Sequence, residues 1–441
     1  MAATDAHPAH SPAARTPEVP PPLGARGVLR IHDYRRIFGA QAISDFGDAL
    51  TNLALLLVVN QLTGSLAALA AMAIVLAVPQ VTIGVVAGAW VDRWDPRRVM
   101  LASDLLRVAL VLGLVVVRSA DMIWVLFVLG LLESSVGTFF TPARMKLVSE
   151  IVPRHGLMAA NSLSQGTRIV AMVLGTGAAG LLVSLGHETW PAFVVDAGTF
   201  LLSFVLLLGL RTRLPVGARA ADGPPPSIVR EIREGIAVVR RSPWLVATLI
   251  SSSVVMLGIG AVNVLFVPLL INDLRVSPAW FAAIDGAQTA GMILAAAVLA
   301  ARLGGVKPGV IVGVTMGGTA GVVALLAGVT AVWQVVILLF AVGLVITPLQ
   351  AAVTTIVQTA TEPKVRGRVA ALLNSVVSGA TVISMAFAGL AGQFLGVRSV
   401  FLLSAAVIGL GAAAAVILFR RGDTEQALNG PPAVSTVAAL D

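Results

Sequence analysis

Long, uninterrupted apolar segments constrain this chain more than any other feature. A helix needs about 20 mostly apolar residues to cross a bilayer, and the sequence holds twelve such segments. They cover residues 38–62, 67–91, 99–118, 121–141, 159–185, 190–210, 244–271, 278–301, 308–328, 331–355, 369–395 and 398–419. Their apolar residues do not alternate with a period of two, as a transmembrane barrel requires. We therefore predict an all-α integral membrane protein with twelve transmembrane helices.

The composition leads to the same class. Hydrophobic residues make up 57% of the chain and charged residues 12%, against roughly 25% charged residues in soluble domains. The absence of cysteine excludes a disulfide scaffold, a thiol nucleophile and a Cys-ligated metal site. The glycine-rich run "GTGAAG" lies within an apolar segment, where helix packing explains it better than nucleotide binding. We expect no enzymatic activity, no cofactor and no bound metal, and we expect His7 and His10 to be solvated in a Pro-rich tail.

The basic residues predict the orientation. With both termini placed in the cytoplasm, the outer loops hold only Arg118, Arg275 and Arg398, while the inner loops and tails hold nearly all other Lys and Arg residues. This asymmetry follows the positive-inside rule. The net charge of +8 is therefore explained by topology, and no nucleic-acid partner is expected.

The predicted spans and the longest inner loop divide the chain into five parts. We predict a disordered N-tail over 1–33, a six-helix half over 34–210, a linker over 211–243, a second six-helix half over 244–420 and a C-tail over 421–441. The linker contains "SIVREIREGIAVVRRSP", with Ser227 as an N-cap and isoleucines four residues apart. This pattern predicts an amphipathic helix on the inner leaflet; a calmodulin-like partner site is the weaker alternative.

The two halves resemble each other in sequence. "TPARMKLV" closes the fourth segment and "TPLQAAVT" lies near the end of the tenth, and Asn161-Ser162 recur as Asn374-Ser375 after 213 residues. Such matches indicate two six-helix repeats, an arrangement that places a binding site at the midplane between them.

One loop carries a dense group of charges. "GAWVDRWDPRRVM" begins with Gly88, which lets a neighbouring helix approach closely. Asp92 follows directly after the second segment, at the end of the predicted helix. A neighbouring helix end or Arg97 can satisfy Asp92, while Arg93, Arg97 and Arg98 anchor the turn at the inner surface. The loop is either a charge latch that holds a cytoplasmic gate closed or a topogenic basic turn.

This loop resembles the signature between helices 2 and 3 of the major facilitator superfamily. With "SDLLR", "FFTPAR", "MAANSLSQ" and "VRGRVAAL", the chain from about 34 to 420 is similar to the drug and siderophore exporters of that family, including macrolide-efflux and enterobactin-exporter-like proteins. Three positions depart from the family pattern. Asp95 replaces a loop glycine, Glu133 stands in the fourth helix where many antiporters have an arginine, and "LGTGAAG" replaces a Gly-Pro motif in the fifth. The proton-relay arginine of the family therefore has no counterpart here.

Ionisable side chains inside the spans are candidates for function because membranes make them costly. They are Asp45, Asp48, Asp104, Arg107, Glu133, Arg168, Asp196 and Asp285. Asp104 and Arg107 are three residues apart on one helix face, which predicts a structural or gating ion pair. Asp196 lies near the outer end of its span, where it could reach interfacial water. The remaining groups are candidates for substrate binding or proton coupling.

Asp45 and Asp48 are the most informative pair. The resemblance places the first helix against the central pathway, with both acids in its cytoplasmic third. Two close carboxylates repel, so that one of them binds a proton more readily than a solitary Asp. They can attract a cationic substrate, exchange it for protons, or simply form a hydrogen-bonded polar helix start. Further polar residues expected near the cavity are Asn52, Asn263, Gln288, Gln350 and Asn374.

These observations predict a secondary active transporter of the major facilitator fold. We expect it to reside in a bacterial inner membrane as a monomer, and to export a drug, siderophore or secondary metabolite by proton antiport with alternating access. Its partners would be the substrate, protons and membrane lipid. A lysophospholipid flippase and an uncoupled facilitator remain alternatives. A transporter-like receptor is disfavoured because the tails are short and of low complexity.

Overall fold

A computed structural model describes residues 23–91, 93–186, 188–212, 228–302, 306–362 and 365–429. The first set of helices is α1 (Ala25–Leu29), α2 (His32–Thr63), α3 (Leu66–Val91), α4 (Pro96–Leu114), α5 (Ile123–Ile151), α6 (Leu157–Gly186) and α7 (Trp190–Leu208). The second is α8 (Ile228–Arg241), α9 (Pro243–Pro268), α10 (Trp280–Arg302), α11 (Pro308–Leu326), α12 (Val332–Ala360), α13 (Arg366–Leu395) and α14 (Val397–Asn429). Single helical turns occur at η1 (Ala120–Met122) and η2 (Arg154–Gly156), and a π turn, η3 (Leu269–Asp273), continues α9.

Eleven of the described helices are long and apolar enough to cross a membrane. The remaining predicted span, 99–118, corresponds to α4, which is as long as α7 and α11 at 19 residues. It is less apolar because it carries Asp104 and Arg107 along with two arginines in its first turn. Since α4 packs against α5 and α7 within the bundle, the twelve predicted spans correspond to twelve helices.

Local sequence signals set several helix boundaries. Asp95 accepts a hydrogen bond from the Arg97 backbone N–H at 2.9 Å and Pro96 follows it, which is the expected pairing of an N-cap with proline in the first turn. Ser242 and Pro243 begin α9 in the same way. Gly64 ends α2 with φ of 58°, a left-handed conformation that glycine adopts without strain.

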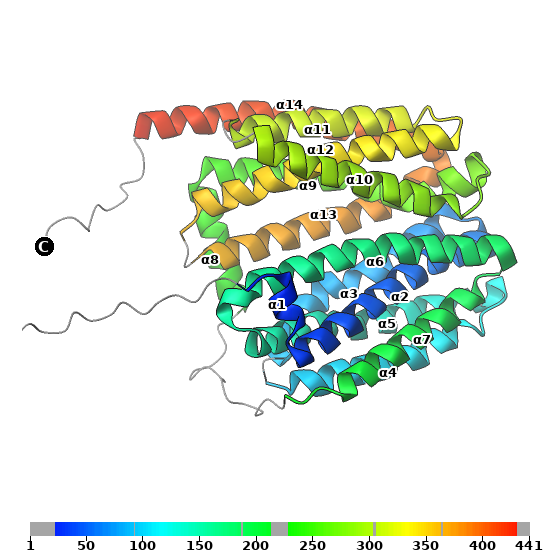
Figure 1. Cartoon of the computed structure of the whole chain (residues 1–441). Helices are drawn as coiled ribbons and strands as arrows, with labels where there is room; N and C mark the ends of the chain where they lie inside the picture. The colour runs from blue at the N-terminus through cyan, green and yellow to red at the C-terminus, as the bar shows by residue number, and fades with distance from the viewer. Residues whose placement is uncertain are drawn as a thin grey trace, which may run out of the picture.

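The helices form two sets of six that repeat each other. Helices α5 and α12 have 29 residues each, α6 and α13 have 30 each, and α4 and α11 have 19 each. Figure 1 shows α2–α7 on one side of the molecule and α9–α14 on the other. These equivalences confirm the expected architecture of two six-helix repeats.

The two sets are joined most closely at the end of the bundle far from α8. There α3 packs against α13 and α6 against α10. A Cβ on Gly180 of α6 would lie 2.2 Å from the Pro278 carbonyl oxygen, and one on Gly389 of α13 would lie 2.4 Å from the Ala70 Cβ. Small residues therefore permit this close approach.

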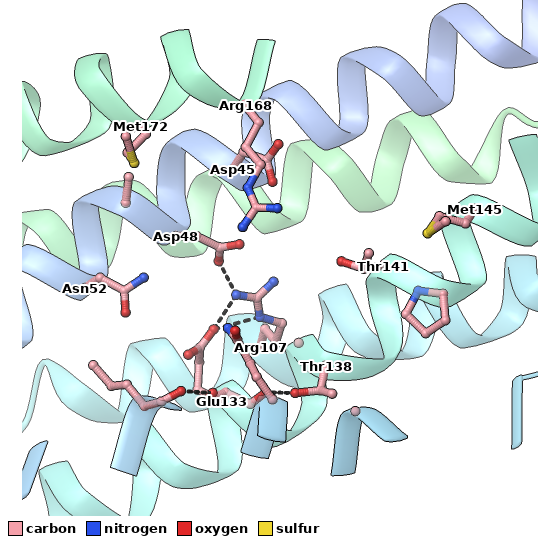
Figure 2. Close-up of a pocket in the computed structure, with 17 residues that line it drawn as sticks. Asp45, Asp48, Asn52, Arg107, Glu133, Thr138, Thr141, Met145, Arg168 and Met172 are labelled. Atoms are coloured by element: carbon pink, nitrogen blue, oxygen red, sulfur yellow. Dashed lines mark hydrogen bonds and ion pairs between the residues drawn. The ribbon is translucent and has the colours of Figure 1, made fainter. Parts of the chain in front are cut away.

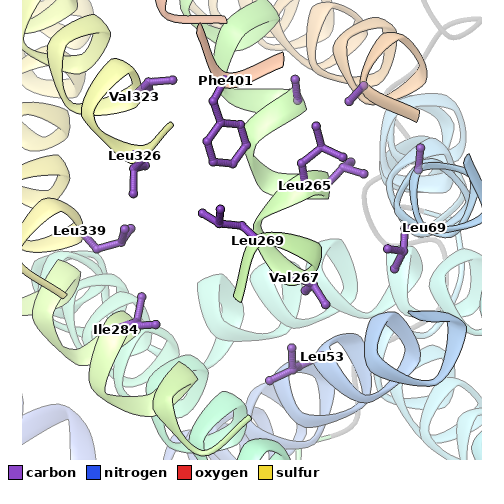
Figure 3. Packing of buried hydrophobic residues seen from close by; sticks show 14 of the residues in the cluster. Leu53, Leu69, Leu265, Val267, Leu269, Ile284, Val323, Leu326, Leu339 and Phe401 are labelled. Atoms are coloured by element: carbon purple, nitrogen blue, oxygen red, sulfur yellow. The ribbon is translucent and has the colours of Figure 1, made fainter. Parts of the chain in front are cut away.

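Hydrogen bonds reinforce the same end. Asn60 near the end of α2 bonds Asn272 of η3. The hydroxyls of Ser184 and Ser277 lie 2.8 Å apart. One apolar cluster also extends through both sets, and Figure 3 shows some of its members, including Leu53 of α2, Val267 of α9 and Phe401 of α14.

The predicted linker helix and tails differ in part from expectation. The amphipathic helix occurs as α8, but it packs on α13 and α9 with Val239 buried instead of presenting its whole apolar face to lipid. Residues 25–29, assigned to a disordered tail, form α1, in which Val28 is buried. Helix α14 continues past the predicted boundary at 420 to Asn429. Ser227, His7 and His10 lie outside the described residues.

Candidate functional site

A cavity of about 490 Å³ lies among α2, α3, α4, α5 and α6 (Figure 2). Its ionisable lining residues are Asp45, Asp48, Arg107, Glu133 and Arg168. The uncharged polar ones include Asn52, Gln80, Ser134, Thr138 and Thr141, and the apolar ones include Leu76, Pro142, Met145 and Met172. A wall of this kind can hold a ligand that has both an apolar body and a charged or polar group.

Arg107 of α4 connects two carboxylates on different helices. Its Nε donates to Glu133 Oε1 of α5 at 2.8 Å, and its Nη2 forms ion pairs with both Glu133 and Asp48 of α2. The dashed lines of Figure 2 mark this bridge. The planar guanidinium offers five donors in a fixed fork, which suits it to bind two acids at once.

The members of this bridge differ in their access to the cavity. The side chains of Arg107 and Glu133 are only 5% and 9% exposed, whereas that of Asp48 is 35% exposed. A buried ion pair is strongly destabilised when one partner is removed, because the other charge is then left uncompensated. Asp48 is thus the member that a proton or a cationic ligand reaches most directly.

Packing holds the guanidinium of Arg107 in place. Its central carbon lies 4.0 Å from the centroid of the Phe200 ring of α7, a favourable cation–π distance. On α5, a Cβ on Gly137 would lie 3.4 Å from the same carbon. An aromatic ring and a glycine therefore position the cation where α2, α4 and α5 meet.

Asp45 belongs to a second polar network. Its Oδ2 accepts a hydrogen bond from Gln41 Nε2 at 3.0 Å, and the Gln41 Oε1 accepts one from Arg144 at 2.9 Å. Arg168 of α6 lies beside Asp45 in Figure 2. The two acids of the first span therefore line one cavity but have different partners.

Two sequence predictions about buried acids are wrong. Arg107 bonds Asp48 and Glu133 and forms no ion pair with Asp104, whose Oδ2 accepts from Ser203 of α7 at 2.5 Å. Asp196 does not reach interfacial water: it is fully buried and accepts a hydrogen bond from Thr51 at 2.5 Å. In both cases the side chain faces a hydroxyl on a neighbouring helix, which neither residue spacing nor position along a span can indicate.

The predicted gating loop lies between α3 and α4, at the end of the bundle opposite the Asn60–Asn272 hydrogen bonds. Arg97 Nη2 donates to the Leu208 carbonyl oxygen at the end of α7, at 2.7 Å, and Arg98 pairs with Asp95 at 3.5 Å. Gly88 is in the last turns of α3 and Arg93 is exposed in the turn that follows. Asp92 lies outside the described residues, so the proposed latch between Asp92 and Arg97 stays a prediction.

The candidates from the second set of helices do not line this cavity. Asp285 of α10 lies beside Thr176 of α6, where the two sets pack together. Asn263, Gln350 and Asn374 are exposed on α9, α12 and α13. The Gln288 backbone is packed closely against Gly343 of α12.

Arg107 is the site residue whose role was missed in the sequence. Two acids in separate spans, Asp48 and Glu133, each needed a cation. Only Arg107 and Arg168 lie deep enough within predicted spans to supply one. Pairing each acid with a cation on a different span would have suggested the bridge. Asp104, the nearest acid along the same helix, suggested the wrong partner for Arg107.

Similarity to known proteins identifies the family to which this chain belongs. The sequence matches the Major Facilitator Superfamily over residues 37–378 and 248–436. The uncharacterised MFS-type transporter YfiS of Bacillus subtilis (strain 168) is 28% identical over 382 residues, covering 83% of this chain and 88% of YfiS. Macrolide efflux protein A of Streptococcus pyogenes is 23% identical over 377 residues, covering 84% of this chain and 92% of that protein.

A solved structure gives the same fold. The nucleoside transporter NupG aligns with a TM-score of 0.71 at 12% identity, covering 88% of this chain and 100% of NupG. At this identity the likeness concerns the fold alone. The family match, the relatives and the membrane-length helices together show that this chain is a multi-pass membrane protein and belongs to the major facilitator superfamily, among transporters related to drug exporters.

Proposed function

We propose that this protein exports a hydrophobic or amphipathic small molecule from the cytoplasm in exchange for protons. The observation that carries the proposal is the bridge from Asp48 through Arg107 to Glu133 on the cavity wall. Ionisable residues inside a membrane protein commonly mark substrate or proton pathways. Here they are arranged so that neutralising one acid changes the partners of a buried cation.

The exchange would depend on Asp48. A proton on this carboxylate removes its negative charge and leaves Arg107 paired with Glu133 alone. A cationic group of the substrate would favour the charged form of Asp48 and so drive its proton off. Proton and substrate would then compete for one site, which is the minimal requirement for antiport. The greater exposure of Asp48 relative to Glu133 supports this assignment.

The cavity wall favours amphipathic substrates with a basic group. Three acids and two arginines line it together with Leu76, Met145 and Met172. Methionine side chains adapt to differently shaped apolar ligands, and the excess of acids attracts cations. A relative named macrolide efflux protein A supports efflux as the direction of transport.

We place both termini in the cytoplasm of a bacterial cell, with the protein in the inner membrane as a monomer. The charge asymmetry of the loops supports this orientation. The seam that includes Asn60 and Asn272 then lies on the outer side. During transport by alternating access, this outer seam would open while the cytoplasmic side closes.

Reconstitution in liposomes that contain a pH-sensitive dye tests the proposal. Addition of a basic amphipathic drug should move protons across the membrane in the direction opposite to the drug, and Asp48→Asn should abolish the coupled movement. Substrate flux without proton movement would overturn antiport and favour a facilitator. Movement of a fluorescent lysophospholipid between leaflets, without drug flux, would favour the flippase alternative.

A further inference from the structure

A second cavity of about 550 Å³ lies on a different face of α5 from the candidate site. It is lined by the turn between α3 and α4, by α4 and by α5. Its residues are Arg93, Trp94, Asp95, Arg98, Val99, Ala102, Ser103, Leu106, Ser135, Val136 and Phe139. None of them lines the first cavity. Because Ala102 and Leu106 are exposed on the outside of the helix bundle, this groove faces the membrane.

The groove is basic at one end. Arg93 is exposed, and the Arg98 side chain is 86% exposed. The one acid of the lining, Asp95, accepts a hydrogen bond from the Arg97 backbone N–H at 2.9 Å and lies 3.5 Å from Arg98 Nε. Among the described lining residues, one acid stands against two arginines, so that these residues carry a net positive charge and present exposed guanidinium donors.

Aromatic rings flank this basic end. Trp94 stacks on Phe139 of α5 with centroids 6.3 Å apart, and Trp90 stacks on the same ring at 6.0 Å. The two indoles are each about half exposed. Tryptophan is enriched at the membrane–water interface, so the rings mark the depth at which a lipid headgroup meets its acyl chains.

The rest of the groove is apolar and runs along two helices. Val99, Ala102 and Leu106 of α4 face Val136 of α5. The Ser103 hydroxyl donates to the Val136 carbonyl oxygen at 3.3 Å, so its polar group is satisfied within the floor. A straight hydrocarbon chain fits such a surface, whereas a soluble anion would leave it uncovered.

Hydrogen bonds within the protein hold the turn between α3 and α4 against α5. Lys146 Nζ of α5 donates to the carbonyl oxygens of Val91 at 2.9 Å and Trp94 at 3.4 Å. This ties the turn that carries Arg93 and Trp94 to α5. A preformed site loses less conformational entropy on binding.

We infer that this groove binds one anionic phospholipid, with its phosphate at Arg93 and Arg98 and an acyl chain between α4 and α5. The positive charge at the basic end of the groove complements an anionic headgroup, and polybasic sites near the inner leaflet recognise such lipids. The inference goes beyond the proposed function, because it holds whatever molecule the cavity inside the bundle carries.

Native mass spectrometry of the purified, delipidated full-length protein tests the site. Phosphatidylglycerol should remain bound at concentrations at which phosphatidylcholine with the same acyl chains does not. Arg93→Ala and Arg98→Ala should each weaken phosphatidylglycerol binding about fivefold. The matched control is Arg118→Ala, since Arg118 is an exposed arginine beyond the other end of α4 and should have no effect.

Two further arms distinguish a lipid from a soluble anion. Ala102→Phe should fill the groove and weaken phosphatidylglycerol binding severalfold with both arginines in place, while inorganic phosphate should compete no better than chloride at equal ionic strength. Equal binding of the two lipids, or equal effects of the Arg98 and Arg118 variants, would overturn the inference. So would displacement of the lipid by phosphate. An unchanged melting temperature in each variant shows that binding, and not folding, has been altered.

Discussion

The carboxamides of Asn60 and Asn272 hydrogen-bond to each other in both directions, at 3.0 and 3.1 Å. One lies near the end of α2 and the other in the π turn that follows α9. A pair of this kind joins equivalent ends of the two six-helix sets. It can separate without leaving a buried charge, which suits a contact that has to break and reform.

We predict that locking this pair stops transport. In a chain without cysteine, Asn60→Cys combined with Asn272→Cys can be joined by a short bifunctional maleimide, and the joined protein should lose efflux because the outer seam cannot open. Each single Cys variant, treated identically, is the control. Full efflux from cross-linked protein would show that these two helix ends stay together throughout the cycle.

Asp48→Asn should abolish uphill efflux and leave substrate binding measurable. The amide matches the protonated carboxyl in size and hydrogen bonding but cannot titrate, so binding survives and coupling is lost. Efflux against a gradient over a pH series is the measurement. Asp45→Asn, in the same cavity but outside the Arg107 bridge, should weaken binding of cationic substrates more than neutral ones. If Asp48→Asn keeps pH-dependent uphill efflux, the coupling role passes to Glu133.

Removal of Arg107 should cost stability as well as transport. Arg107→Gln leaves Asp48 and Glu133 without their shared cation, a loss of about 3–5 kcal/mol for a buried pair. Adding Glu133→Gln should recover part of this loss, since the repulsion between the two acids is then removed. Thermal unfolding in detergent reports both effects. Equal melting temperatures of the wild type and the single variant would contradict the bridge.

Close packing between α10 and α12 should make Gly291→Ala destabilising. Its Cβ would lie 2.1 Å from the Phe340 carbonyl oxygen, and overpacking of this kind typically costs about 1–3 kcal/mol. Gly286→Ala is the matched control on the same helix, because no atom lies within 4 Å of a Cβ there. Melting temperatures should fall for the first variant only; a similar fall for both would point to a general effect of altering α10.

The orientation can be tested with single cysteines. Ser119→Cys precedes η1 and Ser149→Cys lies near the end of α5, and both positions are exposed. An impermeant maleimide added to intact cells should label position 119 and not position 149. Labelling of 149 alone would reverse the topology.

The sequence predicted the helices well and their lateral contacts poorly. Each predicted span corresponds to a helix, because about 20 apolar residues have few alternatives in a bilayer. Arg107 shows the limit of this reasoning. Spacing along one helix favoured Asp104, but the partners of Arg107 are set by how α2, α4 and α5 pack, and that depends on many weak contacts. Fully buried Asp196 was misplaced for the same reason.

The packing of α2 has a consequence for how this protein can acquire new substrates. A Cβ on Gly47 would lie 2.0 Å from Asp196 Oδ1, and one on Gly175 would lie 2.3 Å from the Phe46 carbonyl oxygen. The helix that carries Asp45 and Asp48 is thus pressed against both α7 and α6. A larger side chain at either glycine would force α2 away from its neighbours, so substitutions at these two positions should be destabilising. Adaptive substitutions are instead free to accumulate at residues such as Asn52, Thr141 and Met145, which reshape the cavity without disturbing the frame that positions the acids.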